Sequence, residues 1–437
     1  MAENTREIIL DTLLSLERGE ELSHKLIKAV LDKYDYLESK EKAFIKRVTE
    51  GTIERQLELD YYLNRFSTVP VRKMKPLIRC LLRMSVYQLL YMDAIPDSAV
   101  CNEAVKLAAK RKFHNLKGFV NGTLRNIAKN KDNLPMPDKT KDRAEYLSIR
   151  YSMPKWLVEM WMQEYEGNNQ SAGIQVERIL EGLLQIHSVS LRFRTDLPKE
   201  EKEHILAQLE NTGGKLRQSE YLPYIYLMDN VENVNSLPGF AQGYFTVQDV
   251  SSALAVEAAD IQEGDFVMDI CAAPGGKTIL AAEKAKKVLS RDVSAYKVDL
   301  IQENLQRMRV DNVETQVFDA TSYDAQYFEK ADVVLMDVPC SGLGVMGKKR
   351  DIKYHITPEG LTSLSALQKE IVKNSWQYVK PGGTLLYSTC TIHRAENEDM
   401  VQWIVEHFPF EPEGECRQIL PGYMEADGFF YAKLKRK

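Results

Sequence analysis

Five apolar runs alternate with segments of helical character between residues 250 and 390, and this repeat constrains the fold more than any other feature of the chain. In chain order the runs are DFVMDI, KKVLSRDV, VETQVFD, DVVLMDVP and GGTLLYST. Strands that are apolar on both faces and separated by helices are typical of a parallel sheet that helices cover on both sides. The repeat therefore predicts a doubly wound, Rossmann-like α/β domain.

Each of the five runs ends in a side chain that can take part in chemistry. The run ends are, in chain order, Asp269, Asp292, Asp319, Asp337 and Cys390. A second thiol, Cys340, lies three residues after Asp337. In an open parallel sheet, ligands bind beyond the carboxyl ends of the strands. We therefore expect four carboxylates and two thiols to converge on one edge of the sheet and to form a site there.

The turn after the first run, CAAPGGKT, is built from small residues. It is not a phosphate loop, because Cys271 stands where GxxxxGK[ST] needs its first glycine, and it is not GxGxxG either. Small residues still let a ligand approach the backbone closely. Asp292 follows Cys271 by 21 residues, the spacing at which an acid meets a ribose hydroxyl in such folds. With Asp319 placed for an adenine edge, a ribose and adenine site without a phosphate grip indicates S-adenosylmethionine.

The first 130 or so residues have helical periodicity throughout. The segment REIILDTLLSL, for example, places four aliphatic residues on one face. The polar stretch KNKDNLPMPDKTKD, with two prolines, predicts a linker. Beyond residue 185, HSVSLRF and PYIYLMD have strand character and flank the helical KEEKEHILAQLE, which indicates a small α+β module. We expect a helical domain, a linker with this module, and a catalytic domain, over residues 1–135, 136–240 and 241–437.

Charge is unevenly distributed along the chain. Residues 61–150 contain 18 Lys and Arg against 7 Asp and Glu, a local balance of +11 in a chain whose net charge is -5. A basic face of this kind suggests a polyanionic partner such as nucleic acid. A solvated helical surface explains the same charges, and charge alone does not choose between the two interpretations.

Cysteine usage and hydropathy limit the compartment and the cofactors. The six cysteines are widely scattered and include no CxxC pair, which argues against a zinc site or a disulfide framework and favours a reducing cytoplasm. The chain contains no run of 18 apolar residues, so we expect no transmembrane helix. The first residues lack the layout of a signal peptide. We expect a cytoplasmic protein that uses neither metal nor membrane.

Three motifs, DICAAPGGKT, DVPCSG and YSTCT, resemble in this order those of the RNA cytosine-5 methyltransferases. QDVSS upstream, and RAENE and DGFFYAKL downstream, match further motifs of that family. FIKRVTEGTIERQLELDYYL and NEAVKLAAKRKFHNLKGFVNGTLRNI resemble the helical NusB-type RNA-binding domain. The combination is similar to the RsmB (Sun, Fmu) family of small-subunit ribosomal RNA cytosine methyltransferases over essentially the whole chain.

The resemblance implies a reaction and a set of site residues. The implied reaction is methylation of carbon 5 of a cytosine in small-subunit (16S) ribosomal RNA by S-adenosylmethionine, and we expect a monomer to carry it out. Cofactor contacts are implied for Cys271, Ala272, Ala273, Pro274, Gly275, Gly276, Lys277, Asp292, Asp319 and Asp337. Cys390 of the Thr-Cys pair is implied as the nucleophile, and Cys340 of the Pro-Cys pair as an aid to product release. In the DNA enzymes of this chemistry the Pro-Cys cysteine attacks instead.

The chemistry explains why a thiol is needed. Carbon 5 of cytosine is a poor nucleophile, and a thiolate that adds to carbon 6 turns the ring into an enamine that can take a methyl group. A positive neighbour must lower the thiol pKa from about 8.5, and Lys277 is a candidate. Asp337 is placed to supply a proton or a hydrogen bond at nitrogen 3.

The chain departs from the family pattern at two places, and two other functions remain open. Lys297 stands where the family usually has arginine, and RDIKYH lacks a usual proline and has Tyr354 in place of tryptophan. These departures concern contacts on the RNA side more than the chemistry. The alternatives are a transfer RNA cytosine-5 methyltransferase and, against the presence of both thiols, a non-catalytic RNA-binding assembly factor.

Overall fold

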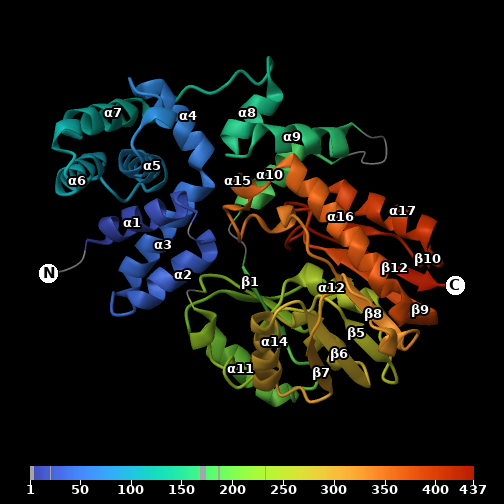
Figure 1. Ribbon diagram of the computed structural model, residues 1–437. Coiled ribbons are helices and arrows are strands. Elements are labelled where there is room, and N and C mark those ends of the chain that lie inside the picture. Colours follow the sequence, from blue (N-terminus) through green and yellow to red (C-terminus); the bar gives the residue numbers. More distant parts are fainter. Residues whose placement is uncertain (1–3, 20, 168–173, 186–187, 232) are drawn as a thin grey trace. The chain divides into compact units, whose positions relative to one another are not determined.

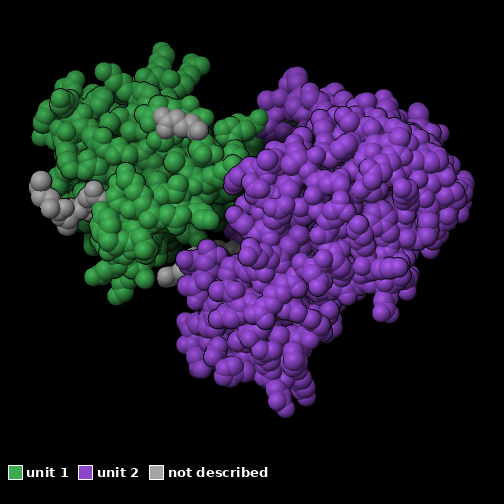
Figure 2. Space-filling model, turned by 60° about the horizontal axis from the view of Figure 1, so that its bottom comes forward, with its two compact units in different colours: residues 1–180, 348–355 green, residues 181–347, 356–437 purple. Residues whose placement is uncertain are grey.

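The computed structural model describes residues 4–19, 21–167, 174–185, 188–231 and 233–437. The chain divides into two compact units, shown in different colours in Figure 2. The first unit comprises residues 1–180 together with 348–355, and the second comprises residues 181–347 and 356–437. A short segment from the C-terminal half of the sequence is thus part of the first unit. The boundaries expected near residues 135 and 240 stay a prediction.

The described part of the first unit is helical, in agreement with the helical periodicity of its sequence (Figure 1). Its α-helices are α1 (Thr5–Glu17), α2 (Ser23–Lys33), α3 (Ser39–Glu54), α4 (Gln56–Phe66), α5 (Pro76–Tyr91), α6 (Asp97–Lys110), α7 (Lys117–Asn130), α8 (Arg143–Arg150), α9 (Lys155–Trp161), the first part of α10 (Val176–Leu184) and the short α15 (Ile352–His355). Helix α5 packs against α1, α3, α4, α6 and α7. Its first residue is Pro76, a position where the missing N–H costs nothing.

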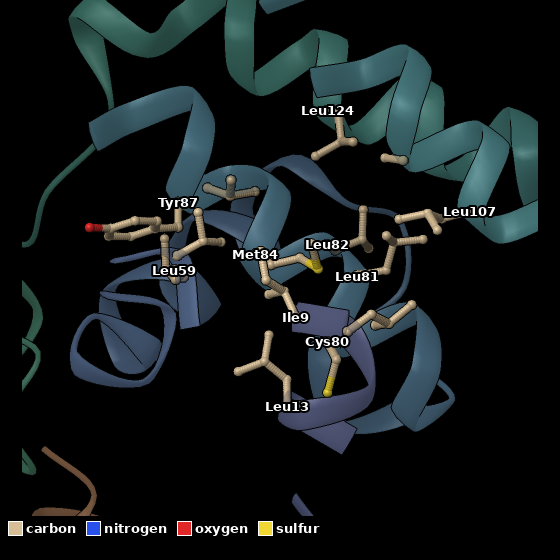
Figure 3. Close-up of a cluster of buried hydrophobic side chains, with 14 of the residues drawn as sticks. Ile9, Leu13, Leu59, Cys80, Leu81, Leu82, Met84, Tyr87, Leu107 and Leu124 are labelled. Carbon is tan, nitrogen blue, oxygen red and sulfur yellow. The ribbon is translucent and has the colours of Figure 1, made fainter. Parts of the chain in front are cut away.

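The core of the helical unit forms around α5 (Figure 3). Helix α1 buries Ile9, Leu10 and Leu13 against it, as the spacing of these residues predicts. Cys80 and Cys101 are buried in the same core and pack like small apolar groups. The linker follows α7 and leads to α8 through a stretch without long helices.

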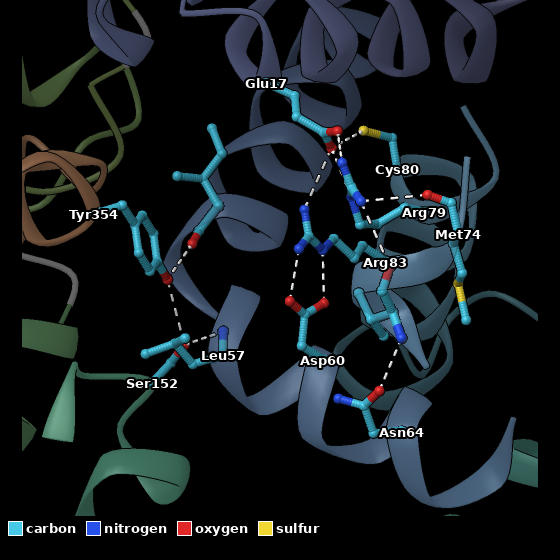
Figure 4. A network of polar contacts seen from close by, with 12 residues as sticks. Glu17, Leu57, Asp60, Asn64, Met74, Arg79, Cys80, Arg83, Ser152 and Tyr354 are labelled. Atoms are coloured by element: carbon cyan, nitrogen blue, oxygen red, sulfur yellow. Dashed lines mark hydrogen bonds and ion pairs between the residues drawn. The ribbon is translucent and has the colours of Figure 1, made fainter. Parts of the chain in front are cut away.

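Charged side chains near this core are paired with one another (Figure 4). Arg83 donates from Nε and Nη2 to the two carboxylate oxygens of Asp60, at 2.7 and 2.6 Å. Glu17 accepts from Arg79 and from the thiol of Cys80. Together these groups line a pocket of 850 Å³. Because a half-buried charge is costly without a partner, the pairing explains how these groups are accommodated there.

Residues 348–355, here called the docking segment, are held by polar contacts to the helical unit. Asp351 accepts hydrogen bonds from the backbone N–H and the hydroxyl of Ser23, both at 2.7 Å, and so caps the start of α2 with a carboxylate. Arg350 forms an ion pair with Glu54 at 2.9 Å. Tyr354, which departs from the family pattern, donates from its hydroxyl to the carbonyl of Ile53 at 2.8 Å and so also contacts the helical unit.

A small antiparallel sheet opens the second unit and confirms the expected α+β module. Its strand order is β2-β3-β1-β4. The strands are β1 (Val189–Phe193), β2 (Leu216–Gln218), β3 (Ile225–Met228) and β4 (Phe245–Val247), and the helix between β1 and β2 is α11 (Lys199–Glu210). Helix α11 packs Ile205 and Leu209 against this sheet.

The large sheet of the second unit has the order β10-β12-β9-β8-β5-β6-β7, with β11 paired to β12. Its strands are β5 (Phe266–Asp269), β6 (Lys287–Asp292), β7 (Val313–Val317), β8 (Ala331–Asp337), β9 (Val379–Thr389), β10 (Phe410–Pro412), β11 (Arg417–Ile419) and β12 (Phe429–Arg436). Strands β5 to β9 are parallel, as the five apolar runs predict. Strand β12 runs antiparallel to β9, and the five runs do not predict it.

Side chains from the two faces of this sheet enter two separate cores, as the alternation of a strand requires. In β8, Val333 and Leu335 join one core, and Val334 and Met336 join the other. The sheet is accompanied by α12 (Val250–Ala258), α13 (Gly276–Ala282), α14 (Ala295–Met308), α16 (Pro358–Ser375) and α17 (Glu398–His407). Helices α12 and α13 contribute to the first core, and α16 and α17 to the second.

The order of the strands reverses between β5 and β8, because the chain moves outward to β6 and β7 on one side and to β8 and β9 on the other. Such a switch point opens a crevice at the carboxyl ends of the strands. Among the described residues, no helix combines the length and the apolar composition needed to cross a membrane.

Candidate active site

The side chains expected at one edge of the sheet do lie there. Asp269, Asp292 and Asp337 are the last residues of β5, β6 and β8, and Cys390 follows the last residue of β9. Asp319 lies two residues beyond the end of β7 and is exposed. The register joins neighbouring strand ends, since Asp292 pairs with Val317 of β7 and Asp337 with Ser388 of β9. We call this edge of the sheet the site rim.

The loop from Cys271 to Lys277, here called the cofactor loop after the role that the sequence predicts for it, is held against β6 by its backbone. The N–H of Ala273 donates to Asp292 Oδ2 at 2.9 Å, and the N–H of Ala272 donates to the carbonyl of Arg291 at the same distance. Gly275 has φ +100°, a left-handed conformation that favours glycine, immediately before α13 begins. The loop therefore follows the end of β6 closely and brings its backbone to Asp292.

Two further side chains complete the surroundings of this loop. Lys297 Nζ lies 2.9 Å from Asp292 Oδ1. A β-carbon at Gly276 would lie 3.7 Å from the amide carbon of Gln248, a residue that is only 5% exposed. Neither amide atom of Gln248 has a hydrogen-bond partner among the described residues. Because a buried amide without partners costs free energy, a ligand with both donors and acceptors fits this position.

An ion pair connects the cofactor loop with the cysteines. Lys277 Nζ donates to Asp337 Oδ2 at 2.7 Å, and the hydroxyl of Ser388 donates to Asp337 Oδ1 at 2.9 Å. Burial by itself lowers the pKa of Lys277, but attraction from Asp337, Asp269 and Cys390 outweighs it and raises the pKa. The raised pKa favours the charged form of Lys277, and the electrostatic interaction with Cys390 contributes to it.

The two thiols face each other at the ends of β8 and β9. Cys340 Sγ and Cys390 Sγ lie 3.2 Å apart and form a thiol pair rather than a disulfide. The hydrogen bond to Cys390 and burial raise the pKa of Cys340 well above its ordinary value, and the charges of Glu396 and Asp337 add to this effect. Either thiol can donate to the other at this distance, and the raised pKa of Cys340 favours its protonated form.

The other residues expected at the site rim lie outside the thiol pair and its ion pair. Burial raises the pKa of the Cys271 thiol, which disfavours its reactive thiolate form. Burial likewise raises the pKa of Asp269 to about 7, although the Thr278 hydroxyl opposes this by donating to it. Asp319 accepts from the N–H and hydroxyl of Thr321, which lowers its pKa. The described residues include no group of three or more His, Cys, Asp or Glu that could hold a metal ion.

Comparison with known proteins gives the family. Residues 256–435 match the family described as 16S rRNA methyltransferase RsmB/F, and residues 3–129 match the NusB family. A protein described as probable ribosomal RNA small subunit methyltransferase B from Bacillus subtilis is 32% identical, with 99% of each chain covered. Ribosomal RNA small subunit methyltransferase B from Proteus mirabilis is 31% identical, with 92% of each chain covered.

The chain belongs to the RsmB family.

A solved crystal structure, that of PH0851, covers all of both chains with a TM-score of 0.80 and 25% identity. Another, of a methyltransferase homolog from Pyrococcus horikoshii, covers 68% of this chain and 99% of its own, with a TM-score of 0.58 and 24% identity, and so bears on the fold alone. These matches and the two family matches confirm a NusB-type helical domain joined to an α/β methyltransferase domain, as the sequence motifs indicate.

The structure of this RsmB-family member also places residues at the site that sequence reasoning does not single out. Glu396 and Gln368 are fully buried and contact the loop that carries Cys340. Asn397 is fully buried and contacts both neighbours of Cys390. Glu396 and Asn397 belong to the RAENE motif, which is recognisable in the sequence although nothing in it assigns these two residues a role.

Proposed function

We propose that this RsmB-family member transfers a methyl group from S-adenosylmethionine to carbon 5 of a cytosine in small-subunit ribosomal RNA, through a covalent bond between Cys390 and carbon 6. The observation that carries the proposal is the 3.2 Å contact between the two thiols, beside the charged Lys277. A thiol pair of this kind has no purpose in a protein that only binds RNA. It fits a reaction in which one thiol attacks and the other completes the cycle.

When bound, S-adenosylmethionine supplies an electrophilic methyl group. The cofactor loop fits this group, because its backbone lies beside Asp292 and Lys297 and because the unpartnered amide of Gln248 lies next to Gly276. Asp292 would hold ribose hydroxyls, since a carboxylate is an acceptor for two O–H donors. Asp319 would bind the edge of the adenine, and the backbone of the loop would contact the remaining polar groups of the cofactor.

Cys390 acts as the nucleophile in this proposal. It shares the charge field of Lys277, and Cys340 can donate an S–H hydrogen bond to its thiolate. Both interactions stabilise the thiolate and lower the barrier to attack at carbon 6. Attack forms the sulfur–carbon bond and pushes an electron pair toward nitrogen 3 of the ring. Lys277 donates to Asp337 at 2.7 Å, so a proton from Lys277 could reach this nitrogen through Asp337.

Cys340 completes the cycle. Its pKa is raised chiefly by the hydrogen bond to Cys390 and by burial, so bonding of Cys390 to carbon 6 removes the strongest of these influences. Cys340 can then lose its proton to solvent and become a base. As a thiolate it takes the proton from carbon 5, and the double bond between carbons 5 and 6 forms again. Cys390 leaves as a thiolate, and nitrogen 3 returns its proton to Lys277 through Asp337. Both thiols return to their starting states.

The substrate class rests on the relatives and on the helical domain. The curated relatives are described as acting on the small ribosomal subunit RNA, and the NusB-type domain is basic in the region of residues 61–150. Transfer RNA remains the alternative substrate. We further propose that the protein acts as a cytoplasmic monomer without metal.

Bisulfite sequencing of ribosomal and transfer RNA tests the proposal. In a strain that lacks the gene, one cytosine of the small-subunit RNA should lose its protection from conversion, and the intact gene should restore it. A gene that carries Cys390→Ala should not restore it. Loss of protection in a transfer RNA alone would favour the alternative substrate, and no change in either RNA would contradict the proposed reaction.

A further inference from the structure

Two adjacent residues, Glu396 and Asn397, lie fully buried between the end of a short helical turn and the start of α17. Their side chains reach the loops after β8 and β9, which carry the two cysteines. A buried carboxylate and a buried amide are costly unless their hydrogen bonds are satisfied. Their partners therefore indicate what these residues do.

Glu396 holds the loop of Cys340. One carboxylate oxygen, Oε2, accepts from the backbone N–H of Ser341 at 2.9 Å, and the other, Oε1, accepts from the Ser341 hydroxyl at 2.6 Å. The amide of Gln368, from α16, donates both to Glu396 Oε2 at 2.9 Å and to the carbonyl of Pro339 at 3.0 Å. The residues before and after Cys340 are thus connected to one carboxylate.

Asn397 holds the loop of Cys390 in the same way. Its Oδ1 accepts from the hydroxyl of Thr389 at 2.6 Å, and its Nδ2 donates to the carbonyl of Thr391 at 3.1 Å. The residues before and after Cys390 are thus connected to one amide. Gln418 accepts a second hydrogen bond from Nδ2 at 2.7 Å and orients the amide.

We propose that Glu396 and Asn397 are positioning residues with separate tasks: Glu396 aims Cys340 for product release, and Asn397 aims Cys390 for attack on the base. The proposal rests on the proposed function of the two thiols. Neighbouring residues of one turn thereby set the distance between two sulfur atoms that lie fifty positions apart.

The chemical nature of each side chain suits this task better than simple packing does. Burial raises the pKa of Glu396, and the hydrogen bonds from Ser341 and Gln368 oppose this and favour the carboxylate. Glutamine in its place can keep the geometry, with its carbonyl oxygen facing the Ser341 N–H and its amide donating to the Ser341 hydroxyl. That hydroxyl can then donate to Thr391 Oγ1, which lies 2.7 Å away.

The separate tasks predict opposite effects on two steps that can be resolved in a single turnover. The full-length protein would be mixed with unmodified small-subunit ribosomal RNA and radiolabelled S-adenosylmethionine, and covalent protein–RNA adduct and released methylated RNA would be measured over time by denaturing electrophoresis. Glu396→Ala should transfer the methyl group yet release the RNA about 10²-fold more slowly, so that adduct accumulates. Asn397→Asp, which keeps the volume but loses the donor to Thr391, should form adduct about 10²-fold more slowly and accumulate none.

Conservative and control variants separate positioning from folding. Glu396→Gln should restore most of the release rate. Because the variant removes one of the negative charges that face Cys340, alongside Cys390 and Asp337, the pH at which release reaches half its maximum should also fall. Asn312→Ala removes two hydrogen bonds to the carbonyls of Ala282 and Ala285, away from the cysteine loops, and should change neither step. If Glu396→Ala is insoluble, Gln368→Ala replaces it and should also slow release.

Cys340→Ala and Cys390→Ala in the same assay distinguish the two levels of the proposal. The proposed function predicts that Cys340→Ala accumulates adduct and that Cys390→Ala forms none. If this holds, but Glu396→Ala and Asn397→Asp slow both steps equally or neither step, the two residues serve the fold alone and the inference fails. If the cysteine variants do not differ in this way, the proposed function fails first.

Discussion

The sulfur atoms of Cys340 and Cys390 lie 3.2 Å apart, in the loops that follow two neighbouring parallel strands. The contact makes their protonation interdependent, because two thiolates at this distance would repel each other and one proton between them is favourable. Lys277 adds a positive charge that acts on Cys390. The contact and the nearby charge therefore place the two thiols in different electrostatic surroundings.

Covalent trapping should distinguish the two thiols. Cys390→Ala should abolish methylation and form no protein–RNA adduct, whereas Cys340→Ala should form an adduct that survives denaturing electrophoresis, because a carbon–sulfur bond links the two molecules. The double variant should form none. Cys416→Ala is the matched control, since Cys416 is exposed and lies outside the site. Adduct in Cys390→Ala, together with its absence in Cys340→Ala, would invert the assignment and make Cys340 the nucleophile.

Asp292 should contribute directly to cofactor affinity. Asp292→Ala removes an acceptor for ribose hydroxyls and also releases the N–H of Ala273 and the ammonium of Lys297. Hydrogen bonds to a charged group contribute about 1.5–3 kcal/mol, so titration calorimetry with S-adenosylmethionine should show affinity weaker by about one to two orders of magnitude. Asp311→Ala removes an exposed carboxylate away from the strand ends and should leave affinity unchanged. Equal affinities of both variants would remove Asp292 from the cofactor site.

Most of the site could be predicted because its residues end strands that local pattern reveals. A run that is apolar on both faces predicts a buried parallel strand, and the position of Asp269, Asp292, Asp337 and Cys390 after such runs is then visible in the chain. Strand β12 escaped prediction because it pairs with β9, more than forty residues earlier, and such a pairing leaves no local signal. Most of its sequence lies in DGFFYAKL, which is recognisable only as a motif.

Glu396 could not be assigned a position from local sequence. It lies in RAENE, a polar stretch that resembles an exposed turn, and its burial depends on Ser341 and Gln368, which come from a loop and a helix elsewhere in the chain. The docking segment escaped for the same reason, since only the folded chain brings Asp351 to the start of α2. Pairings over long sequence separations, rather than propensities, account for what was missed.

The basic region should bind the RNA backbone. If residues 61–150 neutralise about five phosphates, the logarithm of affinity should fall against the logarithm of salt concentration with a slope of about -3.5 to -4.5. Helix α7 carries Lys117, Arg125 and Lys129, all exposed and on one side by helical period. Their combined replacement by alanine should make the slope shallower by about 2 to 3. A triple variant of exposed lysines outside the region (Lys28, Lys33 and Lys40) is the control, and an effect there alone would place the RNA contacts elsewhere.

Asp351 should stabilise the start of α2. Asp351→Ala removes two hydrogen bonds from Ser23, and loss of a capping side chain costs about 0.5–2 kcal/mol. Amide hydrogen exchange in the first turn of α2 should therefore become faster, while exchange in α7 stays unchanged. Asp351→Asn keeps an acceptor and should have a smaller effect. Unchanged exchange in α2 after Asp351→Ala would show that Asp351 of the docking segment does not stabilise this helix.

Lys353 should make the stability of the helical unit depend on pH. Its side chain is buried and donates to the carbonyl of Glu54 at 2.7 Å. Burial lowers its pKa to about 7, against the opposing attraction of Glu54. In the unfolded chain the group has its ordinary pKa, about 10.4. Between these two values the unfolded chain binds more protons than the folded one, so this group makes the free energy of unfolding rise with pH from about 7 to about 10 and leaves it level below 7.

Lys353→Met removes this titration while it keeps most of the volume of the side chain. The midpoint of thermal unfolding of the variant, relative to the parent protein, should accordingly be higher at pH 6 than at pH 9, because only the parent must neutralise or bury an ammonium group at the lower pH. Lys349→Met, an exposed lysine in the same segment, should give the same small difference at both values. A Lys353→Met difference that does not change with pH would mean that Lys353 titrates alike in the folded and unfolded chains, and that its ammonium group is stabilised where it lies.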